Sequence, residues 1–235
     1  MRRSAAALAA LLALPAAAHE EGGIEGDGKP TTERRDVGAF EEIELDTSAD
    51  VSVRVGGERA VSVTIDGNLQ PHLRTEVRRG ALVIRSDRSL HPRTDVRVDV
   101  TVPALRRFEL SGSGDVAIDG GAGALQLAIE GSGDLRWKGE ATELRTSIEG
   151  SGGFRLEGRA DRLEVEVEGS GDVNAAELRA KDVAASVEGS GEVDVRVDGG
   201  SLSASVAGSG DIRWRGEAKV ERVSVTGSGE IARKD

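Results

Sequence analysis

The sequence predicts an all-β protein, a right-handed parallel β-solenoid built from nineteen-residue rungs. Three observations predict this fold class. The tripeptide Gly-Ser-Gly recurs with a nineteen-residue period that one step exceeds by a single residue, strand-like alternation of apolar and polar residues flanks every copy, and the chain has no cysteine. Without disulfides, stability must come from burial and from backbone pairing between stacked rungs about 4.8 Å apart. Parallel crossovers are right-handed in the great majority of folds, which predicts the hand of the coil.

The corners of the repeat are the first element. A glycine tolerates the positive φ of a sharp turn, and a serine hydroxyl can bond the turn backbone and stack in a ladder. The seven copies are regular enough to outweigh the high glycine content of the chain. They comprise Gly112, Ser113, Gly114; Gly131, Ser132, Gly133; Gly150, Ser151, Gly152; Gly169, Ser170, Gly171; Gly189, Ser190, Gly191; Gly208, Ser209, Gly210; and Gly227, Ser228, Gly229.

Strands are expected on both sides of each corner. Apolar residues stand at the second and fourth positions after Gly-Ser-Gly, as in Val116 and Ile118, and three alternate before it, as in Leu163, Val165 and Val167. The intervening residues are polar or small, which is the period-two pattern of a strand with one buried face. Each rung is therefore a strand, a corner, a second strand and a looser return. A single rung cannot bury its own apolar face, so the rungs must stack.

The N-terminal half, residues 36–111, looks like a degenerate version of the regular coil at 112–235. The apolar spacing of Phe40–Leu45 matches that of Leu105–Leu110, and Thr47–Ala49 stands where Gly-Ser-Gly stands later. Val61, Val63 and Ile65 alternate as the coil strands do. Two short apolar segments flank Arg79-Gly80, which predicts a β-hairpin insertion. We expect this half to cap the regular half.

The first 35 residues predict export. Residues 1–18 combine Arg2 and Arg3, an apolar run and a small-residue cleavage site after Ala18, as a signal peptide does. The run is too short to span a bilayer, and no later stretch is apolar enough for a membrane helix. The alternative is a buried N-terminal helix. Residues 19–35 carry no apolar period and predict a flexible leader. The expected location is the periplasm, the cell surface or the medium.

Charge and composition exclude several partners. The formal net charge is −11, and loss of Arg2 and Arg3 with the signal peptide makes it −13, which repels nucleic acid and anionic lipid. Three Phe, two Trp and no Tyr leave few platforms for stacking against bases or sugars.

A family resemblance rests on Val98–Leu105 running into Leu110-Ser-Gly-Ser-Gly-Asp115-Val116, together with the later Gly-Ser-Gly-Asp copies and the strand Gly80–Ile84. From about Val37 onward the chain resembles the putative auto-transporter adhesin, head GIN domain proteins of bacterial envelopes. The resemblance implies an exported β-helical protein of adhesin type and supplies no catalytic residues.

Catalytic residues are not apparent in the sequence. His72 and His91 stand beside prolines in the irregular segment and are interpreted as loop residues without a catalytic role. Gly-Ser-Gly is not a nucleophile elbow, because that motif requires a helix after the serine. Paired carboxylates could cleave polysaccharides on a β-helix, but the sequence singles out no pair. Such an enzyme would need insertions that wall a groove, and only Gly67–Thr94 qualifies. No cofactor is expected.

An acidic ladder follows the corners. Stacked rungs would hold these carboxylates about 5 Å apart, which is unfavourable unless they are solvated or bridged. The preferred interpretation is a solvated corner whose acids accept backbone hydrogen bonds, and the alternative is weak calcium binding. Gly153 is the one gap. The ladder comprises Asp115, Asp134, Asp172, Glu192, Asp211 and Glu230.

The functional hypothesis is a non-enzymatic binding or structural module that presents a rigid flank to a protein or glycan of the envelope or cell surface. Its rivals are a polysaccharide-acting β-helix enzyme and a calcium-stabilised scaffold. At the C-terminal end Arg233 occupies an inward, otherwise apolar position and is expected to block further stacking by its charge. Partners would then bind a flat outward row of small residues. That row comprises Ser147, Ser186, Ser203, Ser205 and Ser224.

Overall fold

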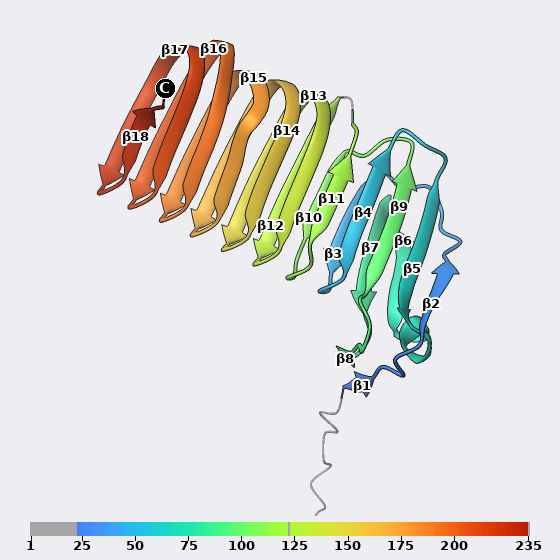
Figure 1. The fold of residues 1–235 in the computed structure, drawn as a ribbon. Coiled ribbons are helices and arrows are strands. Elements are labelled where there is room, and N and C mark those ends of the chain that lie inside the picture. The colour runs from blue at the N-terminus through green and yellow to red at the C-terminus, as the bar shows by residue number, and fades with distance from the viewer. Residues whose placement is uncertain (1–22, 122, 235) are drawn as a thin grey trace, which may run out of the picture.

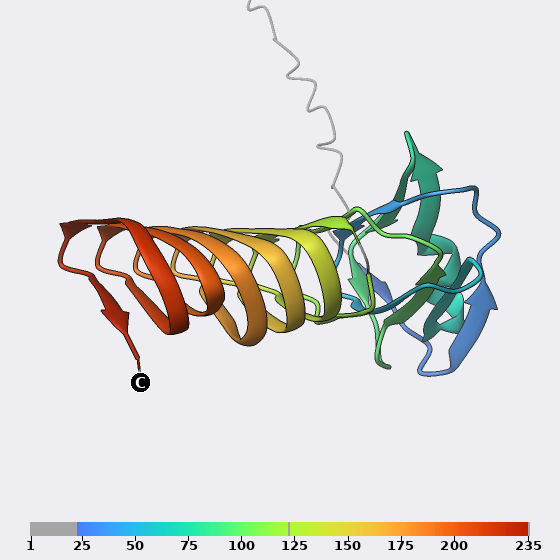
Figure 2. The ribbon, with the colours of Figure 1, turned by 90° about the horizontal axis from the view of Figure 1, so that it is seen from above.

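The computed structural model describes residues 23–121 and 123–234. Figures 1 and 2 show a coil of stacked rungs joined at its N-terminal end to a less regular body. The pairing between neighbouring rungs is parallel and its register follows the period of the sequence, which confirms the predicted β-solenoid. The expected signal peptide, residues 1–18, lies outside the described residues, as does the beginning of the expected leader.

The regular half consists of long strands that each wrap once around the coil. Consecutive strands are joined by the Gly-Ser-Gly corners and pair in parallel along most of their length. The wrapping strands are β13 (Asp134–Gly150), β14 (Gly153–Gly169), β15 (Asp172–Gly189), β16 (Glu192–Gly208) and β17 (Asp211–Gly227), and shorter strands precede and follow them: β10 (Arg107–Leu110), β11 (Val116–Asp119), β12 (Ala124–Gly131) and β18 (Glu230–Arg233).

Each rung has two faces, and we name them by their place relative to the corner. The first face is formed by strands that follow a corner position: β9 (Arg97–Val102), β4 (Asp50–Val55), β11, the opening residues of β13 to β17, and β18. The second face is formed by strands that precede one: β7 (Ala81–Ser86), β3 (Glu42–Asp46), β10, β12 and the closing residues of β13 to β17.

The core runs between the two faces as columns of apolar side chains. The inward positions predicted from the alternation are buried as far as Ile212, whereas those of the last rung are partly or largely exposed. Equivalent residues of successive rungs are register partners, as Val116, Leu135 and Phe154 are. Trp137 is fully buried and its indole N–H donates to the Gly120 carbonyl oxygen at 3.1 Å. Thr146 is buried in the same core, and its hydroxyl donates to the Glu164 carbonyl oxygen at 3.2 Å. The polar atoms of both side chains are therefore paired with backbone.

The corner glycines have two different structural reasons. Gly131 has a φ of 135°, as predicted for a sharp turn. Gly133 does not have a positive φ, but a Cβ there would lie 2.6 Å from the Gly114 carbonyl oxygen of the preceding rung. The third glycine is thus required by close stacking rather than by the turn. Successive corners are linked by serine amides, as where Ser151 N–H donates to the Gly131 carbonyl oxygen at 2.9 Å, and the described corners form no hydroxyl ladder.

The return between the two faces is more regular than the sequence predicts. Ala141, Ala160 and Ala180 are buried register partners that fill the second bend of the coil with small side chains. In the sequence these alanines recur at the same spacing as the adjacent corners, so the regular return could have been predicted. The rung that is one residue longer accommodates its extra residue as an irregularity between the register pairs Arg155–Asn174 and Glu157–Glu177.

The N-terminal half does repeat the coil, although its rungs do not follow chain order. β3 lies between β7 and β10 on the second face, and β4 lies between β9 and β11 on the first. The matching segments Phe40–Leu45 and Leu105–Leu110 are therefore neighbours, with Ile43 paired to Phe108. The chain forms one rung, continues outward to form another, and returns to the inner side of the first.

The hairpin prediction is confirmed. β6 (Leu73–Arg78) pairs antiparallel with β7, and the turn residues Arg79 and Gly80 both have positive φ, as a two-residue hairpin turn requires. The prediction that Val61–Ile65 belongs to the coil is wrong. These residues lie in β5 (Ala60–Asp66), which pairs antiparallel with β9. Alternation reports a half-buried strand but not its direction, and a parallel partner needs a long crossover.

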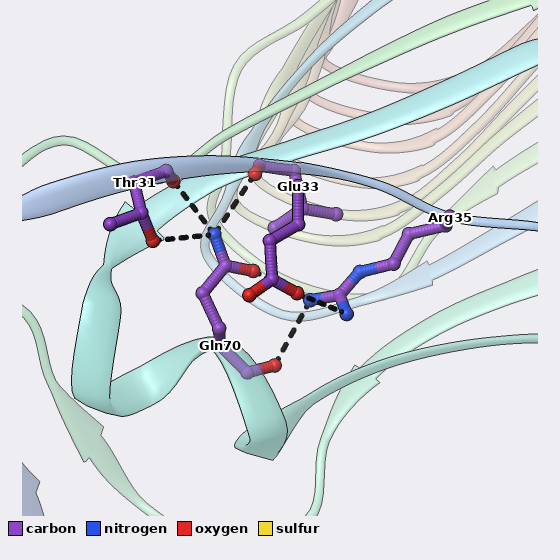
Figure 3. A network of polar contacts seen from close by, with 5 residues as sticks. Thr31, Glu33, Arg35 and Gln70 are labelled. Carbon is purple, nitrogen blue, oxygen red and sulfur yellow. Dashed lines mark hydrogen bonds and ion pairs between the residues drawn. The ribbon is translucent and has the colours of Figure 1, made fainter.

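The flexible leader is also wrong for the residues that the structure describes. β2 (Pro30–Arg34) pairs antiparallel with β5, and β1 (Ile24–Glu25) pairs with β8 (Leu90–His91). Gln70, in the 3-10 helix η1 (Gly67–His72), donates to the carbonyl oxygens of Thr31 at 2.7 Å and Val63 at 3.1 Å, and Arg35 donates to Gln70 Oε1 at 2.6 Å (Figure 3). β2 is held by backbone hydrogen bonds to β5 and by the Gln70 side-chain amide. Its sequence therefore has no apolar alternation that could have predicted it.

The C-terminal end is closed on one face only. β18 pairs with the opening residues of β17, and Arg233 takes the register position beside Trp214, as expected. Its guanidinium lies 5.1 Å from the Trp214 ring centroid and donates to the Gly216 carbonyl oxygen at 3.0 Å. No described strand lies beyond the second half of β17, and Val223 there is exposed. The expectation that charge caps this end is therefore wrong for the second face.

Candidate partner-binding surfaces

The acidic ladder forms a column along one edge of the first face. Asp134, Gly153 and Asp172 are register partners in successive rungs, and Glu192, Asp211 and Glu230 continue the column. Asp115 stands at the same position one rung before Asp134, because Val116 pairs with Leu135. The structure therefore brings together all the residues that the sequence placed in the ladder.

Two of the ladder carboxylates accept backbone hydrogen bonds. An oxygen of Asp172 accepts the Glu192 N–H at 2.9 Å, and Asp211 accepts the Glu230 N–H at 3.0 Å. Arg213 bridges Glu192 at 2.6 Å and Asp211 at 3.2 Å, and its hydrogen bond to Glu192 raises the pKa of its guanidinium. Within residues 23–121 and 123–234, no three acidic or histidine side chains are placed to hold a metal ion. Asp172 and Asp211 therefore satisfy backbone N–H groups of the rung that follows each of them.

A groove of about 640 Å³ lies beside this column on the first face. It crosses β9, β4, β11, β13, β14 and β15, six neighbouring rungs. Ser52 and Ala117 are outward register partners, and Arg136 and Arg155 continue the same outward column. Two small residues beside two arginines hollow the face at that point.

Charges of both signs line the groove. Arg155 pairs with Glu157 at 3.0 Å, which raises the pKa of Arg155 and lowers that of Glu157. Arg97 and Arg136 form no ion pair with any residue of the described ranges. Asp50, Asp115 and Asp134 line the acidic side. The groove therefore offers guanidinium donors and carboxylate acceptors side by side, on a sheet whose backbone is fixed by pairing.

The predicted serine row lies on the second face but is not a single flat row. Ser147, Ser186, Ser205 and Ser224 share one column, which Glu166 interrupts between the first two, while Ser203 lies in the next outward column. The Ser205 hydroxyl donates to Ser186 Oγ at 3.1 Å. Around Ser186, Ser203 and Ser205 the face carries only a shallow depression of about 190 Å³. The signal was present in the sequence, because Glu166 stands one corner-to-corner step after Ser147 and one before Ser186.

A second large groove, of about 790 Å³, lies where the β6–β7 hairpin overhangs the second face. Arg78, Arg79 and Arg85 line it from the hairpin, opposite Glu44 and Glu109 of neighbouring rungs. Sequence reasoning identified the hairpin but not this groove. The sequence shows three arginines in the hairpin and glutamates at 42, 44 and 109, but only the rung order of the structure places these groups side by side.

The histidines belong to the N-terminal body. His72 ends η1, and its Nδ1 lies 3.0 Å from Asp87 Oδ1. Asp87 also pairs with Arg74 at 2.8 Å, and these hydrogen bonds lower the pKa of its carboxyl. His91 lies in the two-residue strand β8. Neither histidine lines either of the two large grooves.

A stack of paired rungs with broad outer faces and shallow, charged grooves defines the class of β-solenoid binding proteins. Such proteins offer a long, rigid surface rather than an enclosed pocket. The described residues contain no helix long and apolar enough to cross a membrane.

The chain belongs to the family described as "Putative auto-transporter adhesin, head GIN domain", which it matches over residues 39–218. No protein with a curated description matches it. Among solved structures, a "putative adhesin" from Bacteroides fragilis is 25% identical and superposes with a TM-score of 0.81, over 90% of this chain and 100% of that one. A "putative lipid binding protein" from Parabacteroides distasonis is 26% identical with a TM-score of 0.76, over 91% and 100%. A "putative adhesin" from the same organism is 25% identical with a TM-score of 0.72, over 91% and 100%.

Proposed function

We propose that this chain is an exported, non-enzymatic binding protein of adhesin type, and that it holds a protein partner in the groove of the first face. The observation that carries the proposal is the groove across six rungs, with Arg97 and Arg136 facing Asp50, Asp115 and Asp134. Guanidinium and carboxylate groups at fixed spacing complement a polypeptide with charges of both signs. Among the described residues that line the groove, no aromatic side chain is exposed to stack on a sugar ring, which favours protein over glycan.

Family membership supports the binding role, and the predicted signal peptide supports export. The serine column of the second face is the competing surface. Its depression is smaller than the groove, and Glu166 divides it. We therefore place the partner on the first face.

Site-specific photocrosslinking in living cells tests the surface. A benzophenone side chain at Ala117 should form a protease-sensitive adduct, and Arg136→Glu with Arg155→Glu should abolish that adduct. Arg213→Glu, in the same outward column outside the groove, is the matched control and should leave it intact. An adduct formed only from position 203 would assign the partner to the serine face, and an adduct resistant to protease but removed by glycosidases would make the partner a glycan.

Export is tested separately. The mature protein should be found outside the inner membrane, with an intact mass that begins at His19. A chain retaining Met1 in the envelope fraction would contradict the cleavage and leave the binding surface untouched.

One observation favours a second candidate function. The groove beside the hairpin is lined by Glu44 and Glu109, which lie side by side on neighbouring rungs, and a pair of carboxylates is the minimum for polysaccharide cleavage. If the chain is such an enzyme, it should release reducing ends from envelope polysaccharides, and Glu44→Gln and Glu109→Gln should each abolish the release. We expect no release from the parent protein.

A further inference from the structure

Three valines at the C-terminal end of the coil are exposed to solvent. Val220, Val223 and Val225 are 48%, 49% and 43% exposed, and no other large hydrophobic residue in the described ranges is exposed to a comparable extent. Their register partners one rung earlier, Leu202, Ala204 and Val206, are buried. The second half of β17 is therefore a core strand without the rung that should cover it.

This end of the coil is a step rather than a flat surface. β18 adds a strand to the first face, over the opening residues of β17, whereas the second face stops at Lys219–Gly227. The first face thus stands one strand higher than the second. The outer edge of Lys219–Gly227 also presents backbone N–H and C=O groups for which no described strand supplies partners.

A step of this kind is complementary to itself. A two-fold rotation about an axis parallel to the strands, midway between the faces, exchanges the first face with the second and preserves position along the strands. The raised β18 of one copy then lies beside the open edge of β17 in the other, and the reverse holds at the second face. Because the chain reverses at each corner, the paired strands are antiparallel, which joins them in a continuous ladder.

The symmetry also fixes the register. Val225 and Ile231 each lie three residues from Ser228, at the centre of the last corner, so they stand at the same height on opposite faces. The rotation brings Val225 opposite the partner's Ile231 and Ser224 opposite the partner's Ala232. Val223 meets the partner's Arg233, whose guanidinium is already held by the Trp214 ring and the Gly216 carbonyl oxygen of its own rung.

We propose that two copies of this chain associate end to end through the last rung, by pairing β17 of each copy with β18 of the other. The inference is independent of the proposed partner in the first-face groove. The open strand is about 30 Å long and the two faces lie about 10 Å apart, so each copy buries roughly 300 Å². That is less than half the area of a standard interface, and the dimer is accordingly weak and dependent on concentration.

Disulfide trapping tests the register, because the chain has no cysteine of its own. Ser224→Cys with Ala232→Cys places thiols on opposite outer faces of one copy, where they cannot meet, and opposite each other across the dimer. Antiparallel partners have Cα separations within the range that a disulfide tolerates. Mild oxidation of the double variant should give a dimer that reducing agent dissolves.

Two controls accompany it. Ser205→Cys with Arg213→Cys occupies the same two columns one rung inside the coil and should stay monomeric. Ser224→Cys alone should also stay monomeric. Equal cross-linking of the inner pair, no dimer from the outer pair, or efficient dimerisation of Ser224→Cys alone would each overturn the proposal, the last because it would pair β17 with β17.

Self-association of the unmodified protein gives the second measurement. Sedimentation velocity over a wide concentration range should show a reversible dimer, and Val223→Lys with Val225→Lys should weaken it by at least about tenfold. Both positions are exposed, so the far-ultraviolet circular dichroism spectrum should not change. A parent protein that stays monomeric at all concentrations, or a lysine variant that dimerises as well as the parent, contradicts the proposal.

Discussion

The two ends of the coil differ in how their last core strand is covered. At the N-terminal end the last core strand, β9, is covered by β5, and β5 is covered by β2. Each of these strands runs antiparallel to the strand that it covers. Val63 and Leu69 are fully buried there, whereas Val223 and Val225 at the C-terminal end are nearly half exposed. The difference indicates that the repeat alone does not cover its own last rung. Residues outside the repeat must cover the last rung, and here only one end has them among the described residues.

The N-terminal cover is also held by the buried polar side chains Asp66 and Gln70. Asp66 is buried beneath the segment before β9 and accepts the backbone N–H of Arg93 at 2.7 Å and the Thr94 hydroxyl at 3.1 Å. Gln70 performs the same task for β2. In the regular half the rungs above and below satisfy most of the backbone, and carboxylates such as Asp172 and Asp211 supply bonds at the corners.

The largest effect should come from opening the covered end. Leu69→Ala leaves a cavity under η1 and should lower the free energy of unfolding by about 2–5 kcal/mol. Val223→Ala, at the uncovered end, removes exposed methyl groups and should change it by no more than about 0.5 kcal/mol. Urea denaturation of both variants at low protein concentration measures the difference. Equal losses would show that the two ends do not differ.

Removing the amide that holds β2 should have a smaller effect. Gln70→Ala deletes the bonds to Thr31 and Val63 and leaves buried carbonyl oxygens without partners, at a cost of about 1–3 kcal/mol. Hydrogen exchange should accelerate in β2 while β14 and β15 stay protected. Gln126→Ala, on the open second face, is the matched control and should leave both regions unchanged.

Acid should weaken the N-terminal cover through Asp66. Burial raises the pKa of this carboxyl, but the Arg93 amide, the Thr94 hydroxyl and amide and the Gly28 amide outweigh it, and the pKa lies below its usual value. A lowered folded-state pKa contributes stability above the unfolded value near 4, and that stability is lost as the pH falls through the folded pKa. In thermal melts the Asp66→Asn variant should therefore have a lower melting midpoint than the parent at pH 7. The two midpoints should converge below pH 4. A constant difference across this range would show that ionisation of Asp66 is not involved.

The smallest effect concerns the charge at the uncovered end. Arg233→Val extends the apolar column beside Trp214 and places a valine where Val223 of a second copy would pack, so self-association should increase. Sedimentation velocity of the variant against the parent measures the change. If the variant associates no more than the parent, Arg233 does not limit assembly.

We expect no calcium-specific effect on the stability of the coil. Asp172 and Asp211 of the ladder accept backbone N–H groups, and the described residues offer no cluster of three acidic ligands. Calcium should therefore shift the melting midpoint no more than magnesium does. A calcium-specific shift that Asp134→Asn with Asp172→Asn abolishes would restore the metal hypothesis, since binding at a hundredfold excess over Kd stabilises by about 2.7 kcal/mol.

Regular parts of the molecule were predictable because their signal is local and repeated. The Gly-Ser-Gly steps fixed the rung length, the alternation marked the inward columns, and Arg79-Gly80 marked the hairpin. The position of the ladder followed from the same period. The groove of the first face was missed, because it depends on Ser52 and Ala117 lying beside Arg136, and the first two of these residues come from rungs that are far apart in the chain.

The sequence by itself determined that this protein is a parallel β-solenoid, since a nineteen-residue period of half-buried strands can bury its apolar face only by stacking. Only the tertiary structure decided which rung lies beside which, that β5 and β2 close one end, and that Val220, Val223 and Val225 leave the other open. The physical reason is that burial and period are properties of a single strand. Pairing direction, rung order and the covering of an end are properties of its neighbours, which alternation does not encode.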